Sequence, residues 1–195
     1  VDDTALSQFL SRYDIGNVLS FAGIAEGVEN SNYLLRTDGG NYILTLYEKR
    51  VDPRDLPFFL EVMQTLASKG MTCPLPVSAT DGSVLQELEG RPCAIFSFLD
   101  GTWSRFPNRE KCRELGRSLA HMHINAAAIT RHRPNALGPL AWQPLFASVK
   151  DFADDLGTGM ATQIQERLDT IVANWPSELP EGVIHADLFP NNVLF

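Results

Sequence analysis

The stretch Val183-Ile-His-Ala-Asp-Leu-Phe-Pro-Asn-Asn-Val-Leu-Phe195 decides which fold this 195-residue sequence predicts. It sets a polar segment between two short apolar runs, and each apolar run is typical of a buried strand. A loop held at both ends by strands can aim the Asp187 carboxylate and the Asn192 side-chain oxygen into one cleft. The carboxylate can orient an attacking hydroxyl group and accept its proton, and an amide oxygen is a ligand that Mg²⁺ accepts. The spacing therefore indicates phosphoryl transfer.

The pattern His185-x-Asp187-Leu188-x-x-x-Asn192 matches the catalytic loop of protein kinases. We expect Asp187 to be the catalytic residue and Asn192 to bind the metal ion. His185 is expected to hold the loop in shape by hydrogen bonds rather than to transfer a proton. The alternative is an ordinary turn, in which Asp187 caps a bend and Asn192 tolerates a left-handed backbone.

The first half of the sequence is rich in strand patterns. Alternating or apolar runs predict strands at about 19–23, 31–36, 42–48, 84–88 and 92–98, and Asp38-Gly39-Gly40 predicts a hairpin turn. Apolar residues at helical spacing predict a helix over about 3–13 and another whose apolar face runs from Phe58 to Ala67, capped by Gly70. This order indicates a small antiparallel sheet with a helix packed on one side.

The second half is helical, with helices predicted at about 108–127, 142–156 and 160–175. We therefore predict an α+β, protein-kinase-like fold. Its N-terminal, nucleotide-binding β-sheet lobe would span 1–97 and its hinge 98–101. Residues 102–195 would form the first part of a mainly helical C-terminal lobe, with the catalytic loop at 185–192.

Composition and charge exclude several classes of protein. The formal net charge of −8 disfavours nucleic acid or an anionic membrane as the main partner, because both require excess Lys and Arg. Cys73, Cys93 and Cys112 form no CxxC pair, which argues against a disulfide framework or a structural zinc site. No apolar run approaches the ~18 residues that span a bilayer, and the first residues lack the pattern of a secretory signal. We expect a cytoplasmic protein with a small-molecule partner, and the oligomeric state stays open.

A weaker signal lies in the segment from Gly23 to Asn30, which joins two predicted strands and carries two glycines. It matches neither GxGxxG nor the Walker pattern, so it is either an ordinary turn or a backbone cover over nucleotide phosphates. Its place before a hairpin, in a sequence that also carries His185 to Asn192, favours the nucleotide loop.

The motif resembles the HGDLHPGNVL-type signature of the aminoglycoside phosphotransferase and choline kinase superfamily. More narrowly, the sequence is similar to the kinase-fold homoserine kinases of bacterial threonine biosynthesis. The stretches that carry the resemblance are Gly27-Val-Glu-Asn-Ser-Asn-Tyr-Leu-Leu35, Tyr42-Ile-Leu-Thr-Leu-Tyr-Glu-Lys-Arg50, Leu56-Pro-Phe-Phe-Leu60 and Gly182-Val-Ile-His-Ala-Asp-Leu-Phe-Pro190.

The resemblance implies transfer from ATP, with Mg²⁺, to the side-chain hydroxyl of L-homoserine, which gives O-phospho-L-homoserine. It implies that Asp187 is the catalytic base and Asn192 a magnesium ligand. The backbone of the hinge would hold the adenine, and the segment from Gly23 to Asn32 would cover the phosphates. The residues expected to bind ATP are Gly23, Gly27, Asn30, Ser31, Asn32, Lys49, Phe98, Leu99 and Asp100.

Two departures from the family pattern stand out. Thr45 occupies the strand position where many relatives carry a Lys or Arg that binds phosphate. Lys49 lies about 13 Å further along at ~3.3 Å per residue, so it replaces that cation only if it meets the phosphates elsewhere. Glu61, the one acid in its helix, either partners such a cation or faces solvent.

The second departure is that the sequence stops at Phe195, before the Asp that would be a second Mg²⁺ ligand and before much of the acceptor pocket. We interpret it as a fragment of a longer enzyme. Two alternatives stay open. The first is a kinase of the same fold for choline, an aminoglycoside or another amino alcohol. The second is a nucleotide-binding module without turnover. A homoserine site needs an Arg or Lys beside an acid, whereas a choline site needs an aromatic cage.

Overall fold

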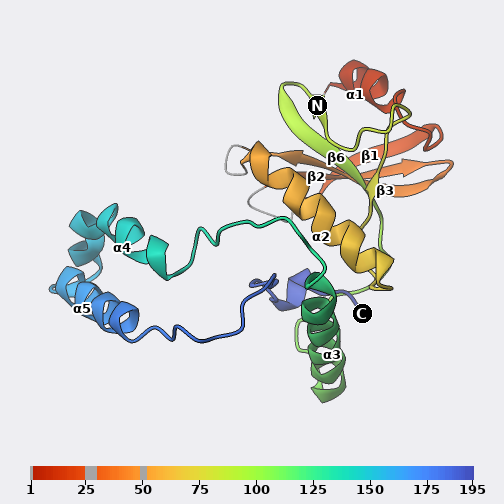
Figure 1. The fold of residues 1–195 in the computed structure, drawn as a ribbon. Helices are drawn as coiled ribbons and strands as arrows, with labels where there is room; N and C mark the ends of the chain where they lie inside the picture. Colours follow the sequence, from red (N-terminus) through yellow and green to blue (C-terminus); the bar gives the residue numbers. More distant parts are fainter. Residues whose placement is uncertain (1, 25–29, 49–51) are drawn as a thin grey trace. The chain divides into compact units, whose positions relative to one another are not determined.

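A six-stranded antiparallel sheet forms the centre of the first half of the chain (Figure 1). The computed structural model describes residues 2–24, 30–48 and 52–195. The strand order is β1-β2-β3-β6-β4, and β5 pairs with β6. The strands are β1 (Val18–Ile24), β2 (Asn30–Thr37), β3 (Gly40–Tyr47), β4 (Pro76–Val77), β5 (Gln86–Leu88) and β6 (Arg91–Ser97). The predicted strands are present, the last hairpin in shortened form, and β4 is an addition.

The β2–β3 hairpin closes at Asp38-Gly39, where Thr37 pairs with Gly40. The Asp38 carboxylate accepts hydrogen bonds from the backbone N–H of Asn17 at 2.7 Å and from its side-chain amide at 2.8 Å. These bonds lower the pKa of Asp38. A Cβ atom at Gly39 would lie 2.6 Å from the carbonyl oxygen of Ile15, so only glycine fits this close approach.

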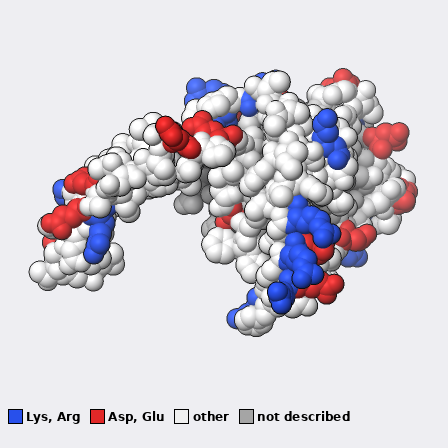
Figure 2. Space-filling model, turned by 60° about the horizontal axis from the view of Figure 1, so that its bottom comes forward, with Lys and Arg blue, Asp and Glu red and all other residues white. Residues whose placement is uncertain are grey.

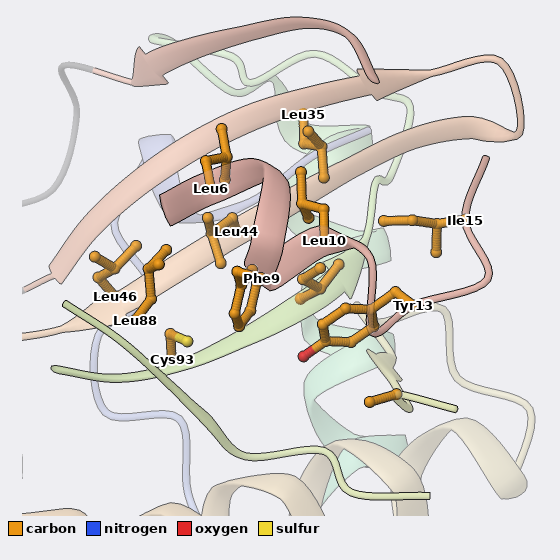
Figure 3. Packing of buried hydrophobic residues seen from close by; sticks show 12 residues of the cluster. Leu6, Phe9, Leu10, Tyr13, Ile15, Leu35, Leu44, Leu46, Leu88 and Cys93 are labelled. Carbon is orange, nitrogen blue, oxygen red and sulfur yellow. The ribbon is translucent and has the colours of Figure 1, made fainter. Parts of the chain in front are cut away.

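The two faces of the sheet carry separate apolar clusters because side chains alternate along each strand. On one face, α1 (Asp3–Leu10) inserts Leu6, Phe9 and Leu10 against buried residues of β2, β3 and β6 (Figure 3). On the other face, Leu60 of α2 (Leu56–Ser68) packs with Ala94 and Phe96 of β6. The one helix predicted to pack on the sheet is α2, and α1 covers the opposite face.

Helix α2 ends as the sequence predicts. Gly70 has a φ of +83°, and its N–H bonds to the carbonyl of Ala67 while the N–H of Met71 bonds to that of Leu66. This pair of bonds satisfies carbonyl groups that the helix end would otherwise leave open. The helix is preceded by the short turn η1 (Pro53–Asp55).

Helix α3 (Arg109–Ala126) is capped by Asn108, whose side-chain oxygen accepts from the backbone N–H of Lys111 at 2.9 Å. The chain forms two compact units, Val1–His132 with Gly182–Phe195, and Arg133–Glu181. The first unit thus contains parts of both predicted lobes, and the lobe boundary at 98–101 stays a prediction.

The second unit contains α4 (Pro139–Ala147), the 3₁₀ segment η2 (Lys150–Leu156) and α5 (Met160–Ala173). The single helix predicted over 142–156 is therefore wrong. The Ser148 hydroxyl bonds back to the carbonyl of Leu145, and Val149 leaves the helical region with φ −123° and ψ 0°. Such local side-chain bonds compete with the helical ladder. Trp142 and Trp175 pack edge to face with ring centroids 5.0 Å apart.

None of the described helices combines the length and the apolar character that crossing a bilayer would need. On the face seen in Figure 2, basic and acidic side chains lie close beside one another rather than in separate broad surfaces. Charges of both signs are therefore mixed on this face, although the sequence has a net charge of −8.

Candidate active site

The predicted catalytic loop brings Asp187 and Asn192 into direct contact. The side-chain nitrogen of Asn192 donates to the Asp187 carboxylate oxygen Oδ2 and to the Asp187 carbonyl, both at 2.8 Å. The turn η3 (Pro190–Asn192) folds Asn192 back over the five-residue separation, and the Asn192 N–H bonds to the Phe189 carbonyl at 2.9 Å. Both side chains are exposed. No described residue contacts Asp187 Oδ1 or Asn192 Oδ1 by a hydrogen bond, so both oxygens can meet a ligand.

The start of the loop is held by His185 and by a strained backbone. The N–H of Asp187 donates to His185 Nδ1 at 3.3 Å, a contact of the kind expected for a residue that shapes the loop. Between them, Ala186 has a φ of +62°. A side chain in this left-handed region costs about 1–2 kcal/mol, and glycine avoids the cost. The family signature has glycine at this position.

The expected strand at Val183–Ile184 is wrong. None of residues 182–189 forms regular structure, because no described segment offers the backbone partner that a strand needs. The chain beyond Asn192 is joined instead to the residue that follows the predicted hinge. Phe195 and Thr102 exchange two backbone hydrogen bonds, at 3.1 and 3.2 Å. Figure 1 shows this C-terminal segment beside α3.

The hinge and the loop are packed tightly at this junction. A Cβ atom at Gly101 would lie 2.9 Å from that of Leu194, so the approach requires glycine. The Lys111 ammonium group lies 4.7 Å from the centre of the Phe195 ring, a cation–π contact. The predicted hinge therefore contacts the two residues that end the segment carrying Asp187.

Thr45 lies on the sheet face that α2 covers, because its neighbours Leu44 and Leu46 point into the cluster around α1. It is 8% exposed, and its hydroxyl donates to Asn32 Oδ1 across the strand pair at 2.8 Å. Asn30 lies on the same face, and its buried Oδ1 has no hydrogen-bond partner among the described residues. A neutral polar pair thus stands at the strand position where the resemblance leads one to expect a cation.

The other described residues expected to bind ATP lie on β1, on β2 and directly after β6. Gly23 pairs with Tyr33 across β1 and β2, and Ser31 faces away from Asn30 and Asn32. The Ser31 hydroxyl bonds at 2.6 Å to Glu48, which also pairs with Arg91. Phe98, Leu99 and Asp100 follow β6 directly. Gly27 and Lys49 lie outside the described residues.

Glu61 has a set of partners that the sequence did not indicate. Its carboxylate accepts from the backbone N–H and the hydroxyl of Thr130 at 3.0 and 3.1 Å, and it pairs with Arg131 Nε at 2.9 Å. The backbone hydrogen bond from Thr130 is the main cause of its lowered pKa. Glu61 therefore does not face open solvent, and its partners among the described residues are Thr130 and Arg131. It ties α2 to the segment after α3, 69 residues away, and no local pattern signals such a contact.

An open cleft of about 410 Å³ lies against the catalytic loop. Its lining residues are Trp103, Arg105, Phe189, Pro190 and Asn191. Sequence reasoning missed Trp103 and Arg105, although both follow the predicted hinge. Among the described residues, no group of three or more His, Cys, Asp or Glu side chains could hold a metal ion. The amide oxygen Asn192 Oδ1 accepts no hydrogen bond from a described residue, and an oxygen of this kind fits Mg²⁺.

Comparison with known proteins gives a consistent result. The model of the phosphotransferase enzyme family matches residues 20–195. A homoserine kinase of Granulibacter bethesdensis is 53% identical over 195 residues, which are all of this chain and 61% of that protein. A homoserine kinase of Paramagnetospirillum magneticum is 52% identical over 100% of this chain and 60% of its own length. The chain thus spans about three fifths of the length of these curated relatives.

Two solved structures are similar in fold. A microcompartment-associated aminopropanol kinase matches 99% of this chain and 64% of its own with a TM-score of 0.74 at 22% identity. A spectinomycin phosphotransferase in complex with ADP and spectinomycin matches 100% and 65% with a TM-score of 0.72 at 15% identity. Likeness at such low identity shows the fold alone.

These findings confirm the α+β, protein-kinase-like fold with an incomplete C-terminal lobe. They also confirm the resemblance to homoserine kinases and to the aminoglycoside phosphotransferases. The residues that carry the resemblance lie within or beside the matched range. This chain therefore belongs to the phosphotransferase enzyme family.

Proposed function

We propose that this protein acts in the cytoplasm and transfers the terminal phosphoryl group of ATP to the side-chain hydroxyl of L-homoserine. The product is O-phospho-L-homoserine, an intermediate of threonine biosynthesis. The observation that carries the proposal is the Asp187–Asn192 contact at 2.8 Å on an exposed loop. The choice of acceptor is supported by relatives named homoserine kinase that are 50–53% identical over nearly the whole chain.

The hydrogen bonds of Asp187 support the catalytic role proposed for it. Asn192 and His185 hold the loop so that Asp187 Oδ2 is engaged and Oδ1 stays open to the acceptor hydroxyl. Asp187 would orient that hydroxyl and accept its proton as the new phosphorus–oxygen bond forms and the bond to the leaving ADP breaks, a contribution of about 10²–10⁴ in rate. Asn192 Oδ1 would hold Mg²⁺, which neutralises charge on the phosphates when bound.

ATP binding is proposed on the α2 face of the sheet. The backbone N–H and C=O groups of Leu99 and Asp100 form no hydrogen bond with described residues, so they can pair with the adenine edge. Asn30 and Asn32 would lie beneath the phosphates, where their side-chain amides would serve as neutral donors, and the Thr45 hydroxyl would hold Asn32 in place. Gly23, Gly27, Ser31 and Lys49 complete the proposed cover, and Phe98 would complete the hinge.

The test measures ATP turnover by the protein at its natural length, with L-homoserine, choline and kanamycin as separate acceptors. We expect turnover with homoserine alone and a loss of at least about 10²-fold in kcat for Asp187→Ala. Asp14→Ala is the matched control, because Asp14 is an exposed acid in the loop after α1. Preferred turnover of choline or kanamycin would contradict the acceptor. ATP binding without any turnover would favour a nucleotide-binding module.

A further inference from the structure

We propose that the cleft beside the catalytic loop, lined by Trp103, Arg105, Phe189, Pro190 and Asn191, selects acceptors that carry a carboxylate, and that Arg105 pairs with this carboxylate. The inference rests on the proposed function and deepens it, because it assigns the part of the chain that distinguishes an amino-acid alcohol from other alcohols.

The position of the cleft supports an acceptor site. Phe189, Pro190 and Asn191 follow Asp187 within the same loop, and Trp103 and Arg105 follow the hinge. The two backbone bonds between Thr102 and Phe195 keep these two segments together. The volume of about 410 Å³ falls in the range of roughly 300–1,000 Å³ typical of small-molecule sites. A molecule held there would lie against the loop that presents Asp187.

The charge of the cleft comes from Arg105. Its guanidinium carbon lies 5.5 Å from the centre of the Phe106 ring, a contact that orients the group and leaves its N–H donors open. No carboxylate of the described residues pairs with it. A guanidinium group presents two parallel N–H donors that match a carboxylate, and this geometry is specific to arginine.

The remaining lining fits the rest of a small amino-acid alcohol. Trp103 and Phe189 are 47% and 65% exposed, so both rings have surface to cover an aliphatic chain. The Asn191 side chain can accept from an ammonium group. Arg105 also argues against the aromatic cage of a choline site, because its positive charge would repel a quaternary ammonium ion.

The experiment compares two acceptors that differ by the carboxylate alone, L-homoserine and 3-aminopropan-1-ol, in the gene product as the cell makes it. For Arg105→Gln we expect kcat/KM with homoserine to fall tenfold to about hundredfold, mainly through KM, because a hydrogen-bonded charge is lost. The value with 3-aminopropan-1-ol should change less than about twofold. Arg105→Lys should recover part of the loss. Arg113→Gln, at an exposed arginine of α3, is the control that should change neither value.

The outcomes separate the two proposals. Wild-type protein that phosphorylates homoserine, with an unchanged KM in Arg105→Gln or an equal loss for both acceptors, overturns the inference and leaves the proposed function standing. Wild-type protein that does not phosphorylate homoserine overturns both. A selective rise in the KM for homoserine in Arg105→Gln supports both.

Discussion

Replacing Thr45 tests whether a neutral hydrogen bond stabilises the strand position where the resemblance leads one to expect a cation. Thr45→Val keeps the shape of the side chain and removes the donor to Asn32 Oδ1 at 2.8 Å. An acceptor left without its donor costs about 1–3 kcal/mol, and the added methyl group returns ~0.8 kcal/mol where it is buried. We therefore expect the free energy of unfolding to fall by about 1 kcal/mol.

The assay is urea unfolding followed by circular dichroism, in which a slope of ~2 kcal/mol/M turns this loss into a midpoint shift of about 0.5 M. Asn32→Ala and the double variant complete a cycle, and we expect the two changes to be coupled by about 1 kcal/mol. Thr170→Val is the control, because the Thr170 hydroxyl bonds to the Glu166 carbonyl on the exposed surface of α5. Its effect should stay below about 0.5 kcal/mol.

One result would refute this reasoning. If the single changes at Thr45 and Asn32 add up without coupling, the hydrogen bond between them does not stabilise the fold. If Thr45→Val also weakens ATP binding while the unfolding midpoint stays constant, the hydroxyl serves the nucleotide rather than Asn32. Either finding would mean that the hydrogen bond between Thr45 and Asn32 does not hold these two strands together at this site.

Three further predictions concern other parts of the first unit. Ala186→Gly relieves the strain of a φ of +62°, so it should leave the free energy of unfolding unchanged or raise it by up to about 1 kcal/mol. The control Ala120→Gly, at an exposed position of α3, should lower that free energy by about 1 kcal/mol. Equal losses in the two variants would contradict backbone strain at Ala186. Burial raises the pKa of Cys93 to about 12, so a thiol reagent at about pH 8 should label Cys112 and spare Cys93. The same burial should lower the free energy of unfolding only above the ordinary thiol pKa of 9.0, where the unfolded chain loses the proton and the folded chain keeps it. Labelling of Cys93 in the native protein would contradict this prediction. Glu61→Ala should speed hydrogen exchange of the backbone amide bonded to that carboxylate by at least about tenfold, and an unchanged rate would mean that the contact does not persist in solution.

Several local features follow from the sequence because neighbouring residues decide them. Gly70 ends α2 because only glycine readily adopts its positive φ, and Asp38-Gly39 closes the hairpin between β2 and β3. The alternation of residues in 42–48 predicts which side chains of β3 enter each core. The spacing of Asp187 and Asn192 predicts that one loop presents both.

The sequence patterns predicted the wrong secondary structure where several weak local preferences compete. The helix predicted over 142–156 breaks at Ser148, since its hydroxyl and Val149 favour a turn there. The strand predicted at Val183–Ile184 lacks a backbone partner. The two residues of β4 are too few to show any period, and they become a strand only because β6 lies beside them.

The sequence by itself determined the class of fold and the presentation of Asp187 and Asn192 by one loop, since both depend on patterns of residues a few positions apart. Only the tertiary structure decided that Glu61 is bound by Thr130 and Arg131, and that Thr45 donates to Asn32. It also placed Arg105 and Trp103 against the loop residues that follow Asp187. Such contacts join segments far apart in the chain, and their formation depends on how the sheet, the helices and the hinge pack together, which no local pattern contains.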